Sequence, residues 1–112
     1  MSFELITSDY FDTEAKALAK RYKSFKKDLI EFRKELEKTP LQGSEIAPNI
    51  RKIRMAIATK GRGKSGGARI ITYNALVTEQ DGKVYLLLIY DKADASSVKM
   101  NVVKQIVKEL IG

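Results

Sequence analysis

The chain has 112 residues, of which 44% are hydrophobic, with no histidine, no cysteine and a formal net charge of +7. This composition suits one globular domain over residues 1–112, and it excludes disulfides, thiolate metal sites and catalysis by histidine or cysteine. The longest apolar run, Tyr85–Tyr90, is far below the roughly 20 residues of a membrane span. We therefore expect a cytoplasmic protein with no membrane partner.

The first third of the chain predicts one strand and two helices. Residues 2–7 are rich in strand formers, and residues 14–22 are rich in alanine, lysine and leucine, which favour a helix. A second helix is predicted over residues 24–38, where Thr39-Pro40 ends it. Its apolar stripe consists of Phe25, Leu29, Phe32 and Leu36. The two helices are expected to form an antiparallel hairpin joined near Lys23.

The remainder predicts three strands and a last helix. A loop at 39–50 precedes a strand over 51–58, in which apolar and basic side chains alternate. A second loop at 59–67 leads to strands over 68–77 and 83–90, joined by a hairpin turn. The final helix is expected to be capped by Ser96 or Ser97. The expected fold is α+β, in the order β-α-α-β-β-β-α.

Basic residues concentrate in one third of the chain. No acidic residue occurs from Ile46 to Thr78, whereas basic and acidic residues balance in the rest of the chain. The seven cations of this region are Arg51, Lys52, Arg54, Lys60, Arg62, Lys64 and Arg69. A surface that carries the whole charge imbalance typically binds a polyphosphate, above all nucleic acid.

Strand parity groups some of these cations with phenols. Lys52 and Arg54 share one face of their strand, Arg69 begins the next strand, and Tyr90 and Lys92 end the third. In an antiparallel meander the start of the second strand lies beside the end of the third. We therefore expect a pocket with several cations, one or two phenols and no carboxylate on the strand faces.

Such a pocket suits the transesterification of RNA. Arginine and lysine stabilise the negative charge of the phosphorane, a lysine could accept the 2′-OH proton, and tyrosine or arginine could serve the leaving oxygen. No metal or cofactor is expected. Basic residues on a sheet edge are, however, more often a binding footprint than a catalytic site, so that reading stays open.

The glycine-rich loop satisfies a phosphate-loop pattern by letter only. Gly61-Arg62-Gly63-Lys64-Ser65-Gly66 matches G-x-G-x-x-G, but a β-branched run follows it instead of the helix that this motif requires. We interpret the loop as a flexible basic arm that reaches a phosphate backbone.

Residues 51–92 resemble the corresponding segment of HigB-like toxins in the RelE/ParE superfamily of toxin–antitoxin systems. The matching features are the R-K-I-R strand, the G-x-G-K-x-G-G-A-R-I-I-x-Y strand entry and the L-L-L-I-Y-x-K strand exit. The helical run R-Y-K-S-F-K-K-D-L and the short terminal helix match as well. The resemblance therefore covers essentially the whole chain.

This resemblance implies a RelE-like fold, with a helical hairpin packed on a small antiparallel sheet. It also implies an mRNA interferase, an endoribonuclease that cuts messages in the ribosomal A site and is neutralised by a cognate helix-turn-helix antitoxin. Carried over by position, the catalytic set is Lys52, Arg54, Arg69 and Lys92, with Tyr90. RelE also has a tyrosine in its last helix, and residues 96–111 here contain none, so a phenol would come from Tyr90 or Tyr73.

RNA or ribosome contacts are expected from Arg51, Lys60, Arg62, Lys64 and Tyr73. Two other functions remain open: a ParE-like toxin that inhibits DNA gyrase through protein contacts, and a nucleic-acid-binding module without activity. The basic constellation favours the nuclease, because an inhibitor that acts through protein contacts does not need it.

Overall fold

Five strands form one mixed sheet within the residues that the computed structural model describes, 2–78 and 80–112. The strands are β1 (Ser2–Thr7), β2 (Ser44–Ala47), β3 (Ile50–Met55), β4 (Ala68–Thr78) and β5 (Asp81–Asp91), in the spatial order β1-β5-β4-β3-β2. Strands β3, β4 and β5 form the predicted antiparallel meander. The expectation of a purely antiparallel sheet is wrong, because β1 pairs in parallel with β5.

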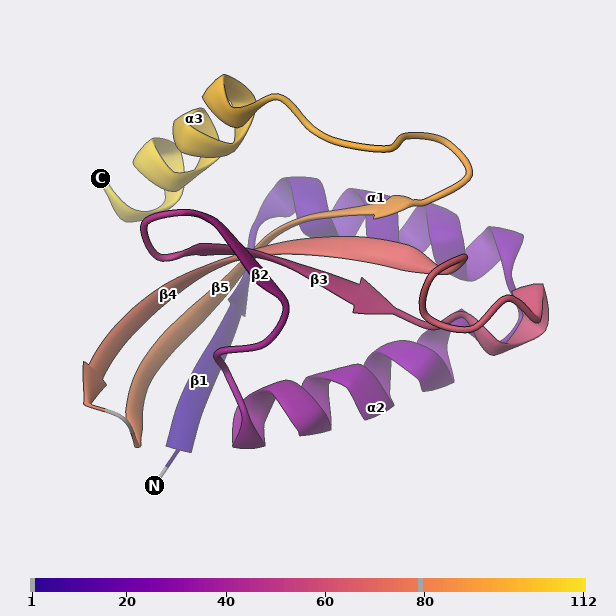
Figure 1. Cartoon of the computed structure of the whole chain (residues 1–112), viewed down its shortest axis with the longest axis horizontal. Helices are drawn as coiled ribbons and strands as arrows, with labels where there is room; N and C mark the ends of the chain where they lie inside the picture. The colour runs from indigo at the N-terminus through magenta and orange to yellow at the C-terminus, as the bar shows by residue number, and fades with distance from the viewer. Residues whose placement is uncertain (1, 79) are drawn as a thin grey trace.

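Helices cover both faces of this sheet, which makes a compact α+β fold (Figure 1). Helices α1 (Asp9–Arg21) and α2 (Phe25–Lys38) run in opposite directions and pack on one face. Helix α3 (Met100–Ile111) packs on the other face, against a cluster that includes Leu87. No helix in the described residues combines the length and apolar character needed to cross a membrane.

The boundaries differ from the predicted ones where tertiary contacts decide them. Helix α1 begins earlier than predicted, because the Ser8 side chain accepts a hydrogen bond from the Phe11 N–H at 3.0 Å and caps it. Strand β3 ends at Met55, and the chain then makes a 3₁₀ turn at Ala58–Lys60. The loop predicted at 39–50 contains β2.

The last helix begins at Met100 and not after Ser96 or Ser97. The preceding segment, 92–99, leaves the end of β5 and returns over the sheet to α3 (Figure 1). Ala95 and Val98 of this segment pack against the apolar cluster under α3. Burial of these side chains holds the segment on the sheet in a non-helical path.

The buried carboxylate of Asp91 joins three segments of the chain. Asp91 ends β5 and is 1% exposed. It accepts hydrogen bonds from Arg21 and Tyr22 of the α1 end, from Lys60 of the loop and from the N–H of Ala93. Burial raises the pKa of this carboxyl, but the hydrogen bonds from Lys60, Tyr22, Ala93 and Arg21 outweigh burial and hold the pKa well below its usual range.

We predict that Asp91→Asn lowers the free energy of unfolding at pH 7 by about 3–5 kcal/mol, because it leaves the Lys60 ammonium buried without its counter-charge. The stabilisation from Asp91 is complete above the unfolded aspartate pKa of about 3.9 and is lost as the pH falls toward the lower folded pKa. Denaturant unfolding at pH 7 and near pH 3 should therefore show a smaller difference between wild type and variant at the lower pH.

Asp94→Asn is the matched control. Asp94 also pairs with Arg21, at 2.9 Å, but this pair is exposed and should contribute less than about 1 kcal/mol. Equal losses in the two variants would contradict the role given to Asp91.

Candidate nucleic-acid interface

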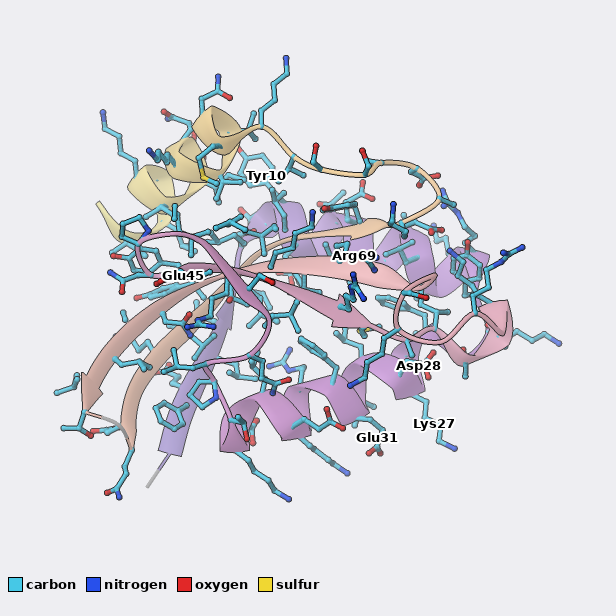
Figure 2. The ribbon with its side chains drawn as sticks, in the orientation of Figure 1. Tyr10, Lys27, Asp28, Glu31, Glu45 and Arg69 are labelled. Carbon is cyan, nitrogen blue, oxygen red and sulfur yellow. The ribbon has the colours of Figure 1, made fainter. Side chains whose placement is uncertain are left out.

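Strand register places three predicted site residues in one row across the sheet. Arg54 of β3 pairs with Arg69 of β4, which pairs with Tyr90 of β5. Residues opposite one another on neighbouring strands lie on the same face. Here it is the face that carries α3 at its other end, and Arg69 lies beside the loop that follows β3 (Figures 1 and 2).

A hollow of about 600 Å³ opens beside this row, and we call it the cation hollow. It is lined by cations from four segments of the chain: Lys52, Arg54, Lys64, Arg69 and Lys92. No carboxylate lines the hollow, and within residues 2–78 and 80–112 none of the five cations forms an ion pair. Several cations without an ion-pair partner around one concave space suit the binding of an anion.

Arg69 is the most buried of these cations, at 4% exposed. Its guanidinium donates hydrogen bonds to the carbonyl oxygens of Lys64 at 3.1 Å, Ser65 at 2.8 Å and Ala68 at 3.2 Å. Arg69 therefore holds the loop in place, a role that the sequence did not indicate. Replacing Arg69 with alanine would also release the loop, so that variant does not test chemistry alone.

Two further contacts fix the walls of the cation hollow. The Lys52 ammonium donates to the Ser96 carbonyl at 3.2 Å, which ties the 92–99 segment to β3. The Lys92 N–H donates to the Gly67 carbonyl at 3.0 Å, which sets the start of that segment beside the loop. Only glycine fits at position 67, because a Cβ there would lie 2.0 Å from the Met55 carbonyl oxygen.

Tyr90 lies beside the cation hollow without lining it. The residue is 9% exposed and belongs to the apolar cluster that Ala95 and Val98 of the 92–99 segment also contact. Its hydroxyl has no hydrogen-bond partner among the described residues. A buried hydroxyl without a hydrogen-bond partner lowers the free energy of unfolding, so its presence in a folded protein needs an explanation.

The other predicted contact residues fall in three different places. Lys60 forms the ion pair with Asp91, so its ammonium is not part of an exposed basic surface. Arg62 is exposed on the loop. Arg51 and Tyr73 line a separate hollow of about 390 Å³. The seven cations of the central region therefore do not form one continuous surface.

Several residues of the interface carried no sequence signal. Ser44 and Ile46 of β2 line the cation hollow, and so does Ser96 of the 92–99 segment. A smaller hollow of about 150 Å³ adjoins Arg54 and Lys64, and it also receives carboxylates from α2. These are Asp28, Glu31 and Glu35, of which the first two are labelled in Figure 2.

The described residues contain no group of three or more side chains suited to hold a metal ion. No protein-family model matches the chain. The cation hollow brings two guanidinium groups, opposite one another in register, together with three ammonium groups, a combination that suits a phosphate group.

We predict that Tyr90→Phe keeps or raises the free energy of unfolding, because the change removes a buried hydroxyl that lacks a partner. Denaturant unfolding measures the difference. Tyr22→Phe is the control: its hydroxyl donates to Asp91, so this variant should lose about 1.5–3 kcal/mol. A comparable loss in Tyr90→Phe would show that the Tyr90 hydroxyl does have a partner in solution.

Proposed function

We propose that this protein is a HigB-like toxin of the RelE/ParE superfamily, with RelE-like topology, and that it cleaves mRNA on the ribosome. The observation that carries the proposal is the cation hollow, which five basic residues line and to which no carboxylate of the described residues contributes. The sequence resemblance and the meander of β3, β4 and β5 support the same assignment.

The proposed reaction is attack of an RNA 2′-oxygen on the adjacent phosphorus. The bond from phosphorus to the 5′-oxygen breaks, which leaves a 2′,3′-cyclic phosphate and a free 5′-hydroxyl. Arg54 and Arg69, opposite one another in register, stabilise the negative charge that the phosphorane gains. In this arrangement the two positive charges already lie beside the phosphate before the reaction begins, so they need not be reoriented as the phosphorane forms.

The reaction also needs two proton transfers, one from the 2′-OH and one to the 5′-oxygen. The lysines of the hollow and Tyr90 are the proposed groups for these transfers. Lys52 and Lys92 both line the cation hollow, and in this proposal one of them accepts the 2′-OH proton. The 5′-oxygen takes a proton from the other lysine or from Tyr90, whose hydroxyl has no hydrogen-bond partner among the described residues. Because the Tyr90 hydroxyl is buried, the side chains packed around it must move before Tyr90 can take part.

The proposed dependence on the ribosome follows from the poor acid–base properties of the side chains in the site. Lysine and tyrosine are poorly matched to acid–base work at pH 7, so the substrate must be held in an in-line geometry by a second body. The ribosome with mRNA in its A site is the proposed holder. Arg62 and Lys64, both exposed on the loop, are the proposed contacts to its RNA backbone.

The proposed cellular setting follows from the resemblance alone. A cognate helix-turn-helix antitoxin would neutralise the protein, and both would act in the cytoplasm. A cation hollow could also bind RNA without cutting it, and a gyrase inhibitor would leave messages intact. The first experiment below separates these outcomes.

We predict that Arg54→Met slows mRNA cleavage at least about 10²-fold, because it removes one preorganised charge from the phosphorane. Arg54 is exposed and makes no side-chain hydrogen bond within the described residues, so the fold should be unaffected. The measurement is expression in cells followed by mapping of mRNA 5′ ends, where new in-frame cuts should occur in translated messages only.

Lys27→Met is the control, since it removes the same charge from the exposed surface of α2 (Figure 2). It should cleave like wild type. Intact messages during growth arrest by wild type would refute the nuclease, and damaged chromosomal DNA in those cells would favour the gyrase inhibitor. Full activity of Arg54→Met would remove Arg54 from the site.

We predict that Arg62→Gln with Lys64→Gln weakens ribosome association and reduces its salt dependence. Loss of two phosphate contacts should lower the slope of log K against log salt by about 1.4, the value for single-stranded RNA. Sedimentation with ribosomes over a range of salt concentrations measures the slope. An unchanged slope would show that the loop makes no phosphate contact.

A further inference from the structure

Another hollow lies between the two helices of the hairpin, and we call it the hairpin groove. It has a volume of about 570 Å³, and within the described residues its lining comes from α1 and α2 alone. Phe11 and Phe25, each 1% exposed, belong both to this lining and to the core beneath the helices. The other apolar members are Ala15, Ala19, Leu29 and Ile30. The hairpin groove is therefore an apolar trough between two helices that run in opposite directions.

The lining of the hairpin groove follows the period of a helix on both sides. The residues in question are Asp12, Ala15, Lys16 and Ala19 on α1, and Lys26, Leu29, Ile30 and Arg33 on α2. Each set extends over two turns, which is about 10 Å along the helix axis. A third helix whose apolar residues repeat with the same period would fit between two such rows.

Ile30 is the apolar member of the lining that is most open to solvent. It is 55% exposed, although it lies in the middle of α2 and next to the half-buried Leu29. A single exposed apolar side chain is normal on a protein surface. Ile30 differs because it borders a hollow that is itself lined by apolar side chains, and a continuous apolar patch of this kind is typical of a protein–protein interface.

The charges around the hairpin groove are predominantly positive. Lys16, Lys26 and Arg33 line it together with one carboxylate, that of Asp12. Within residues 2–78 and 80–112 none of these four side chains forms an ion pair. A partner that brings carboxylates to both sides of the apolar trough would therefore find cations that have no other partner.

Helix α2 carries opposite charges on two of its sides. Lys26 and Arg33 line the hairpin groove, whereas the hollow of about 150 Å³ beside Arg54 receives the carboxylates of this helix. Lysines and glutamates are mixed along the sequence of α2, so the folded helix is what separates them. The groove side of α2 therefore attracts an acidic segment and repels a basic one.

Two other occupants fit the hairpin groove less well. A twofold dimer buries the same patch on both copies, so it would bring the cations of the groove against one another. The formal net charge of +7 also opposes self-association. RNA needs exposed rings on which its bases can stack, and the aromatic side chains of this lining, Phe11 and Phe25, are buried.

We propose that the hairpin groove docks an amphipathic helix of a partner protein, with acidic residues on both sides of its apolar stripe. Apolar residues of that helix at positions i, i+3 or i+4, and i+7 pack against Leu29, Ile30 and the two alanines, and its carboxylates pair with the cations of the groove. Among the described residues the hairpin groove and the cation hollow share no lining residue, so the docked helix leaves the cation hollow open. This inference does not rest on the proposed nuclease activity.

The test is titration of the full, isotope-labelled chain with two synthetic helical peptides, followed by the chemical shifts of its backbone amides. Both peptides have about 14 residues and leucines at the helical period, and they differ only in whether glutamates or lysines flank the leucines. The glutamate peptide should shift amides of residues 12–19 and 26–33 and bind at least about tenfold more tightly than the lysine peptide. Equal affinities, or no binding of the glutamate peptide, would overturn the proposal.

Charge reversal at two consecutive lysines locates the contact. Lys26→Glu should weaken the glutamate peptide about tenfold and strengthen the lysine peptide, because an attraction becomes a repulsion. Lys27→Glu is the matched control: it makes the same change in net charge, but Lys27 does not line the groove (Figure 2). Both lysines are exposed, and circular dichroism checks that each variant is folded. Equal effects of the two variants would show that binding follows net charge alone.

Ile30→Glu tests the apolar contact and should weaken the glutamate peptide at least about tenfold. Val77→Glu is its control, since Val77 is 79% exposed on β4 and does not line the groove. Similar losses in the two variants would contradict docking in the groove.

Three further outcomes would overturn the proposal. Amide shifts confined to residues around the cation hollow would place the peptide there. Displacement of the peptide by a short oligouridylate would show that both ligands compete for one site. A dimer in sedimentation that Ile30→Glu dissociates would assign the hairpin groove to a second copy of the chain. Simultaneous binding of peptide and oligouridylate to a monomer is the expected result.

Discussion

The carboxylate of Asp91 is buried where the end of α1, the loop after β3 and the end of β5 meet, and its ion pairs hold these three segments together. The cation hollow depends on this junction. Lys92 follows Asp91 directly, and the loop that Lys60 anchors continues into the part that Arg69 holds. One buried anion thus fixes two walls of a hollow whose described lining contains no carboxylate.

The sheet separates this anion from the cations. Side chains alternate between the two faces of β5, so Asp91 points toward α1, whereas its neighbours Tyr90 and Lys92 belong to the opposite face. Lys60 forms an ion pair with Asp91, so its charge does not add to the basic surface. The ion pairs of Asp91 on one face of the sheet therefore support the cation hollow on the other face. The cations of the hollow repel one another, which lowers the stability of the fold unless an anion binds between them.

The sequence predicted the parts of the fold that depend on local pattern. Alternation along β3 and the order of the strands were enough to place Arg54, Arg69 and Tyr90 near one another. Contacts between segments that are distant in the chain produce no local pattern in the sequence, so they could not be predicted. The parallel partner of β1, the short strand β2 and the partnership of Lys60 with Asp91 all depend on contacts more than 30 residues apart or on strands too short to show a period. The role of Arg69 was hidden for a different reason. Its partners are the nearby carbonyl groups of Lys64, Ser65 and Ala68, and side-chain type does not encode contacts to the backbone.

The pairing of β1 with β5 has a consequence for how the protein is made. Strand β1 can pair with β5 only after residues 81–91 have been synthesised. Until then an edge of β1 stays open, and the row from Arg54 to Tyr90 is incomplete. Long sequence separation of this kind delays folding. A nascent chain that ends before residue 81 thus carries the basic loop but lacks β5 and Lys92, and with them one wall of the cation hollow.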